Sequence, residues 1–255
     1  MKIADDILAI LARCQTEGDV LYLPDEQLDR KTYEAVNKCL VAIGGRWDRK
    51  SKGHVFDHDP ADDLDSMLLT GEVTDTKKLY QFFPTPRPIA EQMCDLAELD
   101  STCTVLEPSC GRGDLADVIH ERGVAEIFGV ELNQDMERYL HDKPYACMVG
   151  VDFLEFARDE NHYWDRIVMN PPFAHGQDVQ HVLAAYKLLA SAGVLVSVMS
   201  PSPFFRDNKA SVGFREWLRE VYAEVTDVPE GAFKDSGTTI RTKIVKIKRY
   251  HGNRW

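Results

Sequence analysis

Several features that would mark a specialised protein are missing from this sequence. No apolar run reaches the roughly 18 residues of a membrane-spanning helix, and acids stand at positions 5 and 6, where a signal peptide would begin its apolar segment. The six cysteines include no Cys-x-x-Cys pair, so structural zinc and a disulfide framework are not expected. Neither internal repeats nor low-complexity tracts occur. These absences predict a globular, cytoplasmic protein without a membrane or metal partner.

An overall excess of basic residues is also missing. The net charge is -12, whereas proteins that bind nucleic acids usually present a basic surface. Cations are nevertheless concentrated in residues 44–54, which hold one acid, and in the last fifteen residues, which hold none. Either segment can contact phosphates or form a solvated face. The cations of the first segment are Arg46, Arg49, Lys50 and Lys52.

The length of 255 residues allows one sizeable core and a small additional domain. A change of pattern near residues 70–80 predicts a small α+β domain at 1–75 and a second domain at 76–255. In the first domain, hydrophobic periodicity predicts helices at 4–14 and 29–43, a strand at 20–23, a hairpin at 46–56 and a short helix from 59.

The second domain alternates short apolar runs with helical segments. This alternation is typical of an α/β fold with a mostly parallel, Rossmann-like sheet that is covered on both faces. The runs at 223–228 and 239–248 predict an antiparallel pair at the sheet edge. The other expected strands lie at 104–107, 126–130, 146–149, 166–169 and 194–199, and the expected helices at 88–99, 114–122, 134–141 and 179–190.

The first candidate site segment is a glycine-containing loop that follows a strand and precedes a helix. It reads Val105-Leu106-Glu107-Pro108-Ser109-Cys110-Gly111-Arg112-Gly113-Asp114. Gly111 and Gly113 let the backbone approach a ligand that faces the N-terminus of the next helix. The pattern fits a dinucleotide and also any other adenosine-containing cofactor, and it does not distinguish them.

Acidic residues follow the next two apolar runs. Glu131 lies about 20 residues beyond the glycine loop, which is the spacing of an acid that holds ribose hydroxyls. The alternative for Glu131 is a cap on the following helix. Asp152 can accept a hydrogen bond from an adenine amino group, with Phe153 against the ring, and can also cap a helix.

The segment Asn170-Pro171-Pro172-Phe173 directly follows an apolar run, at the C-terminal end of a predicted central strand. Ligands bind at such ends in open α/β sheets. The prolines remove two N–H donors, and the Asn170 side-chain oxygen and Pro171 carbonyl can accept both protons of an amino group. This pairing aims the nitrogen lone pair at a methyl donor. Phe173 can stack a base that has been flipped out of its duplex, so the four residues are the predicted catalytic group.

Together these segments resemble the amino-methyltransferase branch of the class I S-adenosylmethionine-dependent methyltransferases, and within it the phage and bacterial DNA adenine-N6 enzymes. The resemblance covers about residues 79–249. It implies S-adenosyl-L-methionine as the cofactor and a class I methyltransferase sheet with an antiparallel last strand. The cofactor-binding residues that it implies are Thr85, Pro86, Glu107, Pro108, Gly111, Gly113, Glu131, Asp152, Phe153 and Asn170.

Two further segments carry the resemblance. Phe83-Pro84-Thr85-Pro86 is similar to the family element whose backbone contacts the methionine part of the cofactor. Residues 231–239 resemble the loop that packs against the flipped base in this family, so Phe233 is a second candidate stacking residue. The motif order resembles enzymes with a C-terminal target-recognition domain, but little of this chain follows the last strand. Low or short sequence specificity is therefore expected.

The N-terminal domain, with Gly44-Gly45-Arg46-Trp47, resembles a small module found beside phage-type methyltransferases. Its hairpin could place Arg46, Arg49 and Lys50 on DNA phosphates. Alternatively, the domain serves for packing, and Trp47 and Phe56 form a minor core. In residues 202–209, Phe205 is a further candidate for DNA contact.

The expected activity is transfer of a methyl group from S-adenosylmethionine to the N6 amino group of a flipped adenine in DNA. A monomer or weak homodimer in the cytoplasm of a bacterial or phage-infected cell would carry it out. Three alternatives stay open: RNA adenine-N6 methylation, protein glutamine methylation, and an inactive cofactor- and DNA-binding module. Glutamine enzymes of this type usually have tyrosine at the position of Phe173.

Overall fold

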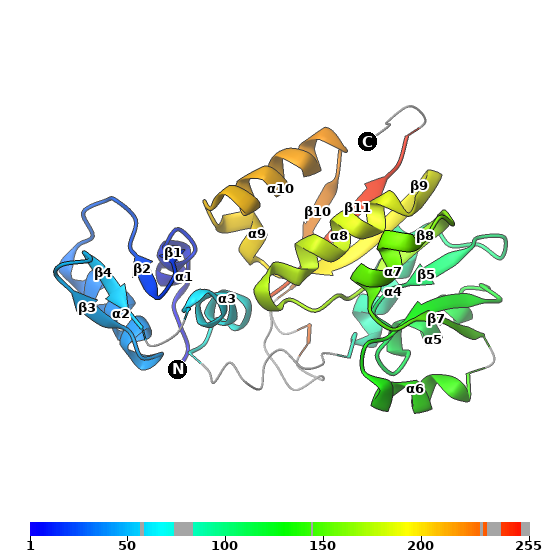
Figure 1. Ribbon diagram of the computed structural model, residues 1–255, viewed down its shortest axis with the longest axis horizontal. Coiled ribbons are helices and arrows are strands. Elements are labelled where there is room, and N and C mark those ends of the chain that lie inside the picture. Colours follow the sequence, from blue (N-terminus) through cyan, green and yellow to red (C-terminus); the bar gives the residue numbers. More distant parts are fainter. Residues whose placement is uncertain (57–58, 74–83, 144, 230–231, 234–240, 251–255) are drawn as a thin grey trace.

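The structure is a computed structural model that describes residues 1–56, 59–73, 84–143, 145–229, 232–233 and 241–250. Two sheets form its scaffold (Figure 1). A four-stranded antiparallel sheet lies within the first 55 residues, and a seven-stranded mixed sheet begins at Val105.

The N-terminal sheet has the strand order β1-β2-β4-β3. Asp29 caps the helix behind it by accepting hydrogen bonds from the backbone N–H groups of Lys31 and Thr32. The short strand β1 was not expected from the sequence, whereas the hairpin was. The elements are α1 (Asp5–Leu11), β1 (Gln15–Glu17), β2 (Val20–Tyr22), α2 (Arg30–Ala42), β3 (Arg46–Asp48), β4 (Gly53–Val55) and α3 (Ala61–Thr70).

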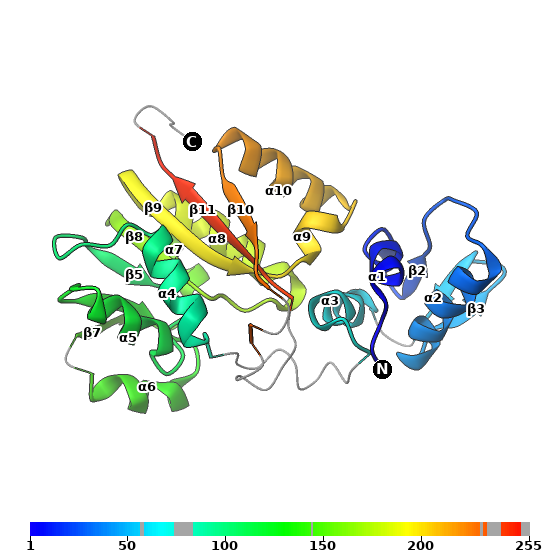
Figure 2. The same ribbon diagram turned by 180° about the vertical axis from the view of Figure 1, so that it is seen from behind.

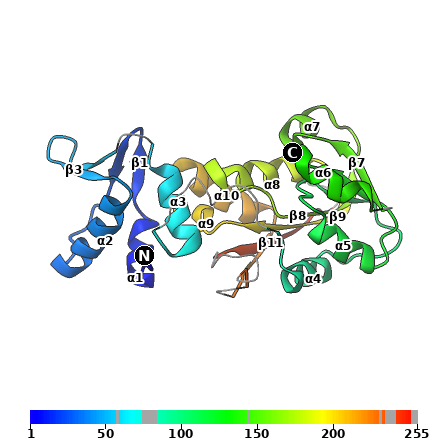
Figure 3. The same cartoon turned by 90° about the horizontal axis from the view of Figure 1, so that it is seen from below.

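Helix α3 belongs to two hydrophobic cores. Its residues Leu64 and Met67 lie in the cluster built by α1, α2 and the small sheet. Leu69, on the same helix, lies in a cluster of the large sheet, and the three views place α3 between the two sheets (Figures 1 and 3). The predicted boundary at residue 75 falls on 74–83, outside the described residues, so the division into two domains stays a prediction.

The large sheet has the strand order β10-β11-β9-β8-β5-β6-β7. The pairs from β9 to β7 are parallel, and β11 is antiparallel to both of its neighbours. Strand β10 forms the edge beside β11 (Figure 2). The expected Rossmann-like class with an antiparallel last strand is confirmed. The strands are β5 (Val105–Glu107), β6 (Ile127–Val130), β7 (Ala146–Gly150), β8 (Trp164–Met169), β9 (Leu189–Met199), β10 (Glu224–Asp227) and β11 (Lys243–Lys248).

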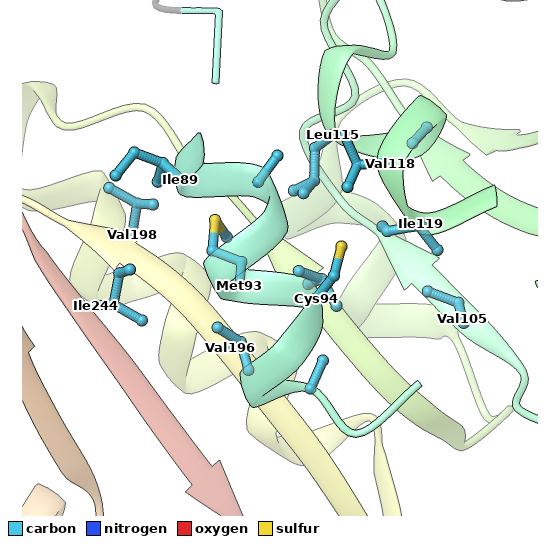
Figure 4. Packing of buried hydrophobic residues seen from close by; sticks show 14 of the residues in the cluster. Ile89, Met93, Cys94, Val105, Leu115, Val118, Ile119, Val196, Val198 and Ile244 are labelled. Carbon is cyan, nitrogen blue, oxygen red and sulfur yellow. The ribbon is translucent and has the colours of Figure 1, made fainter. Parts of the chain in front are cut away.

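Helices cover both faces of this sheet (Figure 3). Helix α4 presents Ile89, Met93 and Cys94 at helical spacing, and these residues share a buried cluster with Val196 of β9 and Ile244 of β11 (Figure 4). The opposite face is covered by α7, α8 and α10. The helices are α4 (Arg87–Leu96), α5 (Asp114–Glu121), α6 (Gln134–His141), α7 (Phe153–Asp159), α8 (Gln177–Lys187), α9 (Ser202–Phe205) and α10 (Lys209–Glu220).

Three local expectations differ from the structure. Helix α8 ends at Lys187, and Leu189, which was assigned to that helix, begins β9. A short apolar run does not distinguish a helix end from a strand start, because both bury it. Helices α7 and α10 were not expected.

All six cysteines are free, and four of them are buried as small hydrophobic side chains.

Candidate active site

A cavity of about 340 Å³ opens at the C-terminal ends of four adjacent parallel strands, β8, β5, β6 and β7. Each strand is followed at once by a cavity residue, because parallel strands bring their carboxyl ends to one edge. The residues contributed in this way include Glu107, Glu131, Asp152 and Asn170. The sequence therefore predicted the main walls of this site.

The glycine loop bends through two left-handed residues. Gly111 has φ +53° and Gly113 has φ +86°, and a Cβ atom on Gly113 would lie 2.9 Å from Leu140 Cδ2. Only glycine adopts these angles without strain. Gly111 lines the cavity, whereas Gly113 lies behind it as the N-cap of α5.

Glu131 holds this loop in place. Its Oε2 accepts a hydrogen bond from Gly111 N at 2.6 Å, and its Oε1 accepts one from Asn133 N at 2.7 Å. These bonds hold the glycine loop and the turn before α6, and the expected cap on that helix stays a prediction. Each carboxylate oxygen has a second acceptor site, so ribose binding by Glu131 stays a compatible prediction.

Asp152 is the N-cap of α7. Its Oδ1 accepts hydrogen bonds from Leu154 N at 2.8 Å and Glu155 N at 3.0 Å. Because both bonds use Oδ1, Oδ2 can serve a ligand. Phe153 is buried and also lines the cavity, so the cap and the predicted adenine contact can coexist.

The wall of the cavity suits a polar, cationic ligand. Burial raises the pKa of Glu107 well above its usual range, and the neighbouring carboxylates of Asp114 and Glu131 raise it further. Among the described residues, no hydrogen-bond partner exists for buried Glu107 Oε2, Ser109 Oγ or His181 Nδ1. Buried polar groups without partners are rare and mark ligand sites. S-adenosylmethionine fits these groups, because it has polar groups along its length and a positively charged sulfonium.

The predicted catalytic tetrapeptide, Asn170-Pro171-Pro172-Phe173, follows β8 and forms another wall of the same cavity. Asn170 Nδ2 donates a hydrogen bond to Thr85 Oγ1 at 3.2 Å. This bond identifies the donating end of the amide, so Oδ1 is the end that can accept. Phe173 is only 5% exposed, yet it lines the cavity. The structure thus joins Thr85 to Asn170 across 85 residues of sequence.

Some predicted site residues lie elsewhere. Pro86 is the N-cap of α4 and does not line the cavity. Phe205 lines a separate cavity, to which α1, α3 and the β10–β11 pair contribute, and is 49% exposed. Phe233 is fully buried in the core and is not part of the cavity wall, so its expected stacking role is not supported. Phe83 and residues 234–239 of the expected base-contacting loop lie outside the described residues.

The expectation of a basic strip in the last fifteen residues needs correction. Lys246 and Lys248 both pair with Glu98, at 2.9 and 3.0 Å, which lowers the pKa of Glu98 to about 2. The other described cations also have partners within the protein: Arg241 pairs with Asp5, Lys243 pairs with Asp227, and Arg249 bonds Leu189 O. Arg241 and Lys243 are thus each paired with one acid, whereas Lys246 and Lys248 share one carboxylate and Arg249 bonds a neutral carbonyl, so the charge of this segment is compensated in part.

The cations of the β3–β4 hairpin differ from those of the last fifteen residues in their charge partners. Arg46, Arg49 and Lys50 are exposed, and within the described part of the chain no ion pair involves them. The one acid of the hairpin, Asp48, accepts hydrogen bonds from Ser51 N and Oγ. Trp47 is 47% exposed, so it does not form the minor core that was the alternative, although Phe56 is buried.

Several site residues were not expected from the sequence. His181 and Gln177, one helical turn apart on α8, line the cavity. Asp178 is fully buried and accepts hydrogen bonds from Ser200 N at 2.9 Å and Ser200 Oγ at 2.8 Å. The only sequence signal was their position just after the tetrapeptide. Among the residues that the structure describes, no helix could cross a membrane and no acid, histidine and cysteine cluster could hold a metal ion.

The fold is that of the class I S-adenosylmethionine-dependent methyltransferases. A protein from Listeria monocytogenes described as a putative class I S-adenosylmethionine-dependent methyltransferase superposes with a TM-score of 0.51 at 14% identity, over 70% of this chain and 65% of that protein. A type I restriction-modification methyltransferase subunit from Streptococcus thermophilus gives 0.55 at 24% identity, over 67% and 46%. The EcoKI M protein gives 0.57 at 14% identity, over 97% and 58%. The expected class I methyltransferase fold is thus confirmed.

A curated relative adds likeness in sequence. The modification methylase CviBIII of Paramecium bursaria Chlorella virus NC1A is 33% identical over 106 residues, which is 40% of this chain and 28% of the relative. The chain thus spans less than a third of this relative and about half of the restriction-modification subunits. No family model matches the chain.

Proposed function

We propose that this protein methylates the N6 amino group of adenine in DNA, with low or short sequence specificity. The observation that carries the proposal is the position of Asn170-Pro171-Pro172-Phe173 at the end of β8, in the wall of the cofactor cavity. Bound S-adenosylmethionine would supply the methyl group. Glu107, Glu131, Asp152 and Phe153 are the residues that would hold it.

The chemistry needs an amino group held in a fixed orientation. Asn170 Oδ1 and the Pro171 carbonyl are two acceptors, and an exocyclic amino group has two protons to donate. Accepting both protons directs the nitrogen lone pair toward the methyl donor, so the gain comes from orientation. The hydrogen bond from Asn170 to Thr85 preorganises the amide before substrate binds.

DNA is favoured over the other substrates by two supports. The similar proteins are a modification methylase and restriction-modification methyltransferase subunits. The hairpin also carries Arg46, Arg49 and Lys50, which are exposed and form no ion pair with another residue that the structure describes. An adenine in a duplex must be flipped out to reach Asn170, at a cost of a few kcal/mol. Phe173 offers the flipped base an aromatic face inside the cavity.

The decisive experiment uses labelled cofactor with duplex DNA, single-stranded DNA, RNA and a glutamine-containing protein. Nucleoside analysis of the DNA should show N6-methyladenine, and mapping of the modified sites should show a short target or none. Label in RNA alone or in glutamine alone would refute the proposal. Absence of any transfer, with cofactor binding intact, would favour the inactive binding module.

A further inference from the structure

The cofactor cavity contains a histidine that none of the site motifs includes. His181 lies on α8 and lines the cavity together with Asp152, Phe153 and Leu154. Its ring centroid is 5.2 Å from that of Phe153. This places an imidazole at the part of the cavity where the adenine of the cofactor is expected.

The side chain of His181 is built for a polar partner. It is only 6% exposed, and its buried Nδ1 has no hydrogen-bond partner among the described residues. Burial lowers the pKa of His181 to about 4, although the neighbouring Asp152 opposes the shift. The imidazole is therefore neutral near pH 7, with one nitrogen that donates and one that accepts.

Adenine presents complementary groups on one edge. Its exocyclic amino group donates, and the adjacent ring nitrogen accepts. The cavity offers an acceptor in Asp152, whose Oδ1 already caps α7 and whose Oδ2 can serve a ligand. A neutral imidazole can supply the matching donor. Hypoxanthine reverses both groups, because its oxo group accepts and its ring nitrogen carries a proton.

We propose that His181 is a specificity residue for the adenine base of the cofactor and acts together with Asp152. The inference rests on the assignment of the cavity to S-adenosylmethionine, but it does not depend on which substrate is methylated. A purely structural histidine would pack against Phe153 without affecting which base is bound.

Calorimetry can measure the binding of S-adenosylhomocysteine and S-inosylhomocysteine. It tests the role of His181 in base specificity without any turnover. The unaltered protein should prefer the adenosyl compound. In His181→Phe, which keeps a ring beside Phe153, the ratio of the two dissociation constants should fall about tenfold, the effect of one net hydrogen bond. His181→Gln restores a donor and an acceptor and should recover part of the preference. Thermal unfolding without ligand would verify that each variant is folded.

His162→Phe is the matched control, because His162 is exposed, lies beside Trp164 and is not a cavity residue. It should keep the preference of the unaltered protein. The proposal is overturned if His181→Phe keeps that preference, or if it weakens both compounds equally. Failure of the unaltered protein to bind S-adenosylhomocysteine would instead contradict the cofactor assignment on which the proposed function depends.

Discussion

At the scale of single residues, the site consists of side chains with two tasks each. Glu131 holds the glycine loop through Gly111 N and is also the expected ribose ligand. Asp152 caps α7 and faces the cavity. A residue that fixes its own backbone in this way is already positioned when a ligand arrives, so little ordering is needed on binding.

Asn170→Ala tests the central residue. The variant should keep the fold, because Asn170 lies in the wall of the cavity and belongs to neither hydrophobic cluster of the large sheet. Loss of the preorganised acceptor should reduce kcat about 100- to 1,000-fold, with little change in cofactor affinity. Single-turnover methylation of DNA measures the loss. A variant as fast as the unaltered protein would refute the proposed mechanism.

Asp178 should make stability depend on pH. Burial raises the pKa of Asp178 from 3.8 to about 7, although hydrogen bonds from Ser200 oppose the shift. Between about pH 4 and pH 7 the native state therefore binds more protons than the unfolded chain, so this contribution to stability falls as pH rises. The buried His181 acts in the opposite direction, because burial lowers its pKa.

Comparison with the variant Asp178→Asn isolates the contribution of Asp178 to the pH dependence of stability. The contribution of His181 is present in both proteins and is removed when the two are subtracted. The unfolding free energy of the unaltered protein minus that of the variant should decrease from about pH 4 to about pH 7. Urea denaturation at several pH values measures this difference. A difference that is constant with pH would show that Asp178 is not protonated in the native state.

At the scale of elements, the cations of two hairpins differ in whether acids of the protein pair with them. Those of β11 are held by acids of neighbouring elements, as Lys246 and Lys248 are by Glu98. Those of the β3–β4 hairpin project from an edge strand with Trp47 among them. A two-stranded ribbon of this kind fits the major groove of DNA, where both of its faces can make contacts.

Paired charge removals distinguish the two hairpins. Arg49→Gln/Lys50→Gln should weaken DNA binding and reduce the slope of log affinity against log salt by about 2, because each phosphate contact adds about 0.9. Lys246→Gln/Lys248→Gln removes the same charge and should leave the slope unchanged. Fluorescence anisotropy of a labelled duplex measures both. Equal slopes in the two variants would show that the β3–β4 hairpin does not contact DNA phosphates.

At the scale of the whole molecule, the two sheets are joined through α3. Arg206, at the end of α9, is buried and forms an ion pair with Asp65 of α3 at 2.6 Å. It also donates a hydrogen bond to Ala61 O at 2.9 Å. Helix α3 contacts the segment Ala174–Gly176 that follows the catalytic tetrapeptide. Helix α3 is therefore packed against the segment that follows the proposed catalytic tetrapeptide.

Arg206→Met should destabilise the protein by about 3–5 kcal/mol, because it removes the buried guanidinium that pairs with the mostly buried Asp65 carboxylate. Asp65→Leu/Arg206→Met removes both charges and should be more stable than the single variant. Urea denaturation measures both free energies of unfolding. If the single variant is as stable as the unaltered protein, the ion pair does not join the two parts.

The sequence by itself determined the α/β alternation, the antiparallel last strand and most of the cavity wall. Those features are local: hydrophobic periodicity defines strands and helices, and the residue after each parallel strand must reach the ligand edge. It also predicted the β3–β4 hairpin that carries Arg46, Arg49 and Lys50.

Only the tertiary structure decided how distant segments meet. Lys246 pairs with Glu98, which lies 148 positions away in the sequence. Asn170 bonds Thr85, which lies 85 positions away. The burial of Phe233 and the position of His181 in the cavity depend on the packing of whole elements. Local patterns carry no signal for such contacts, because one side chain can be exposed, paired or buried according to which neighbouring element the fold brings against it.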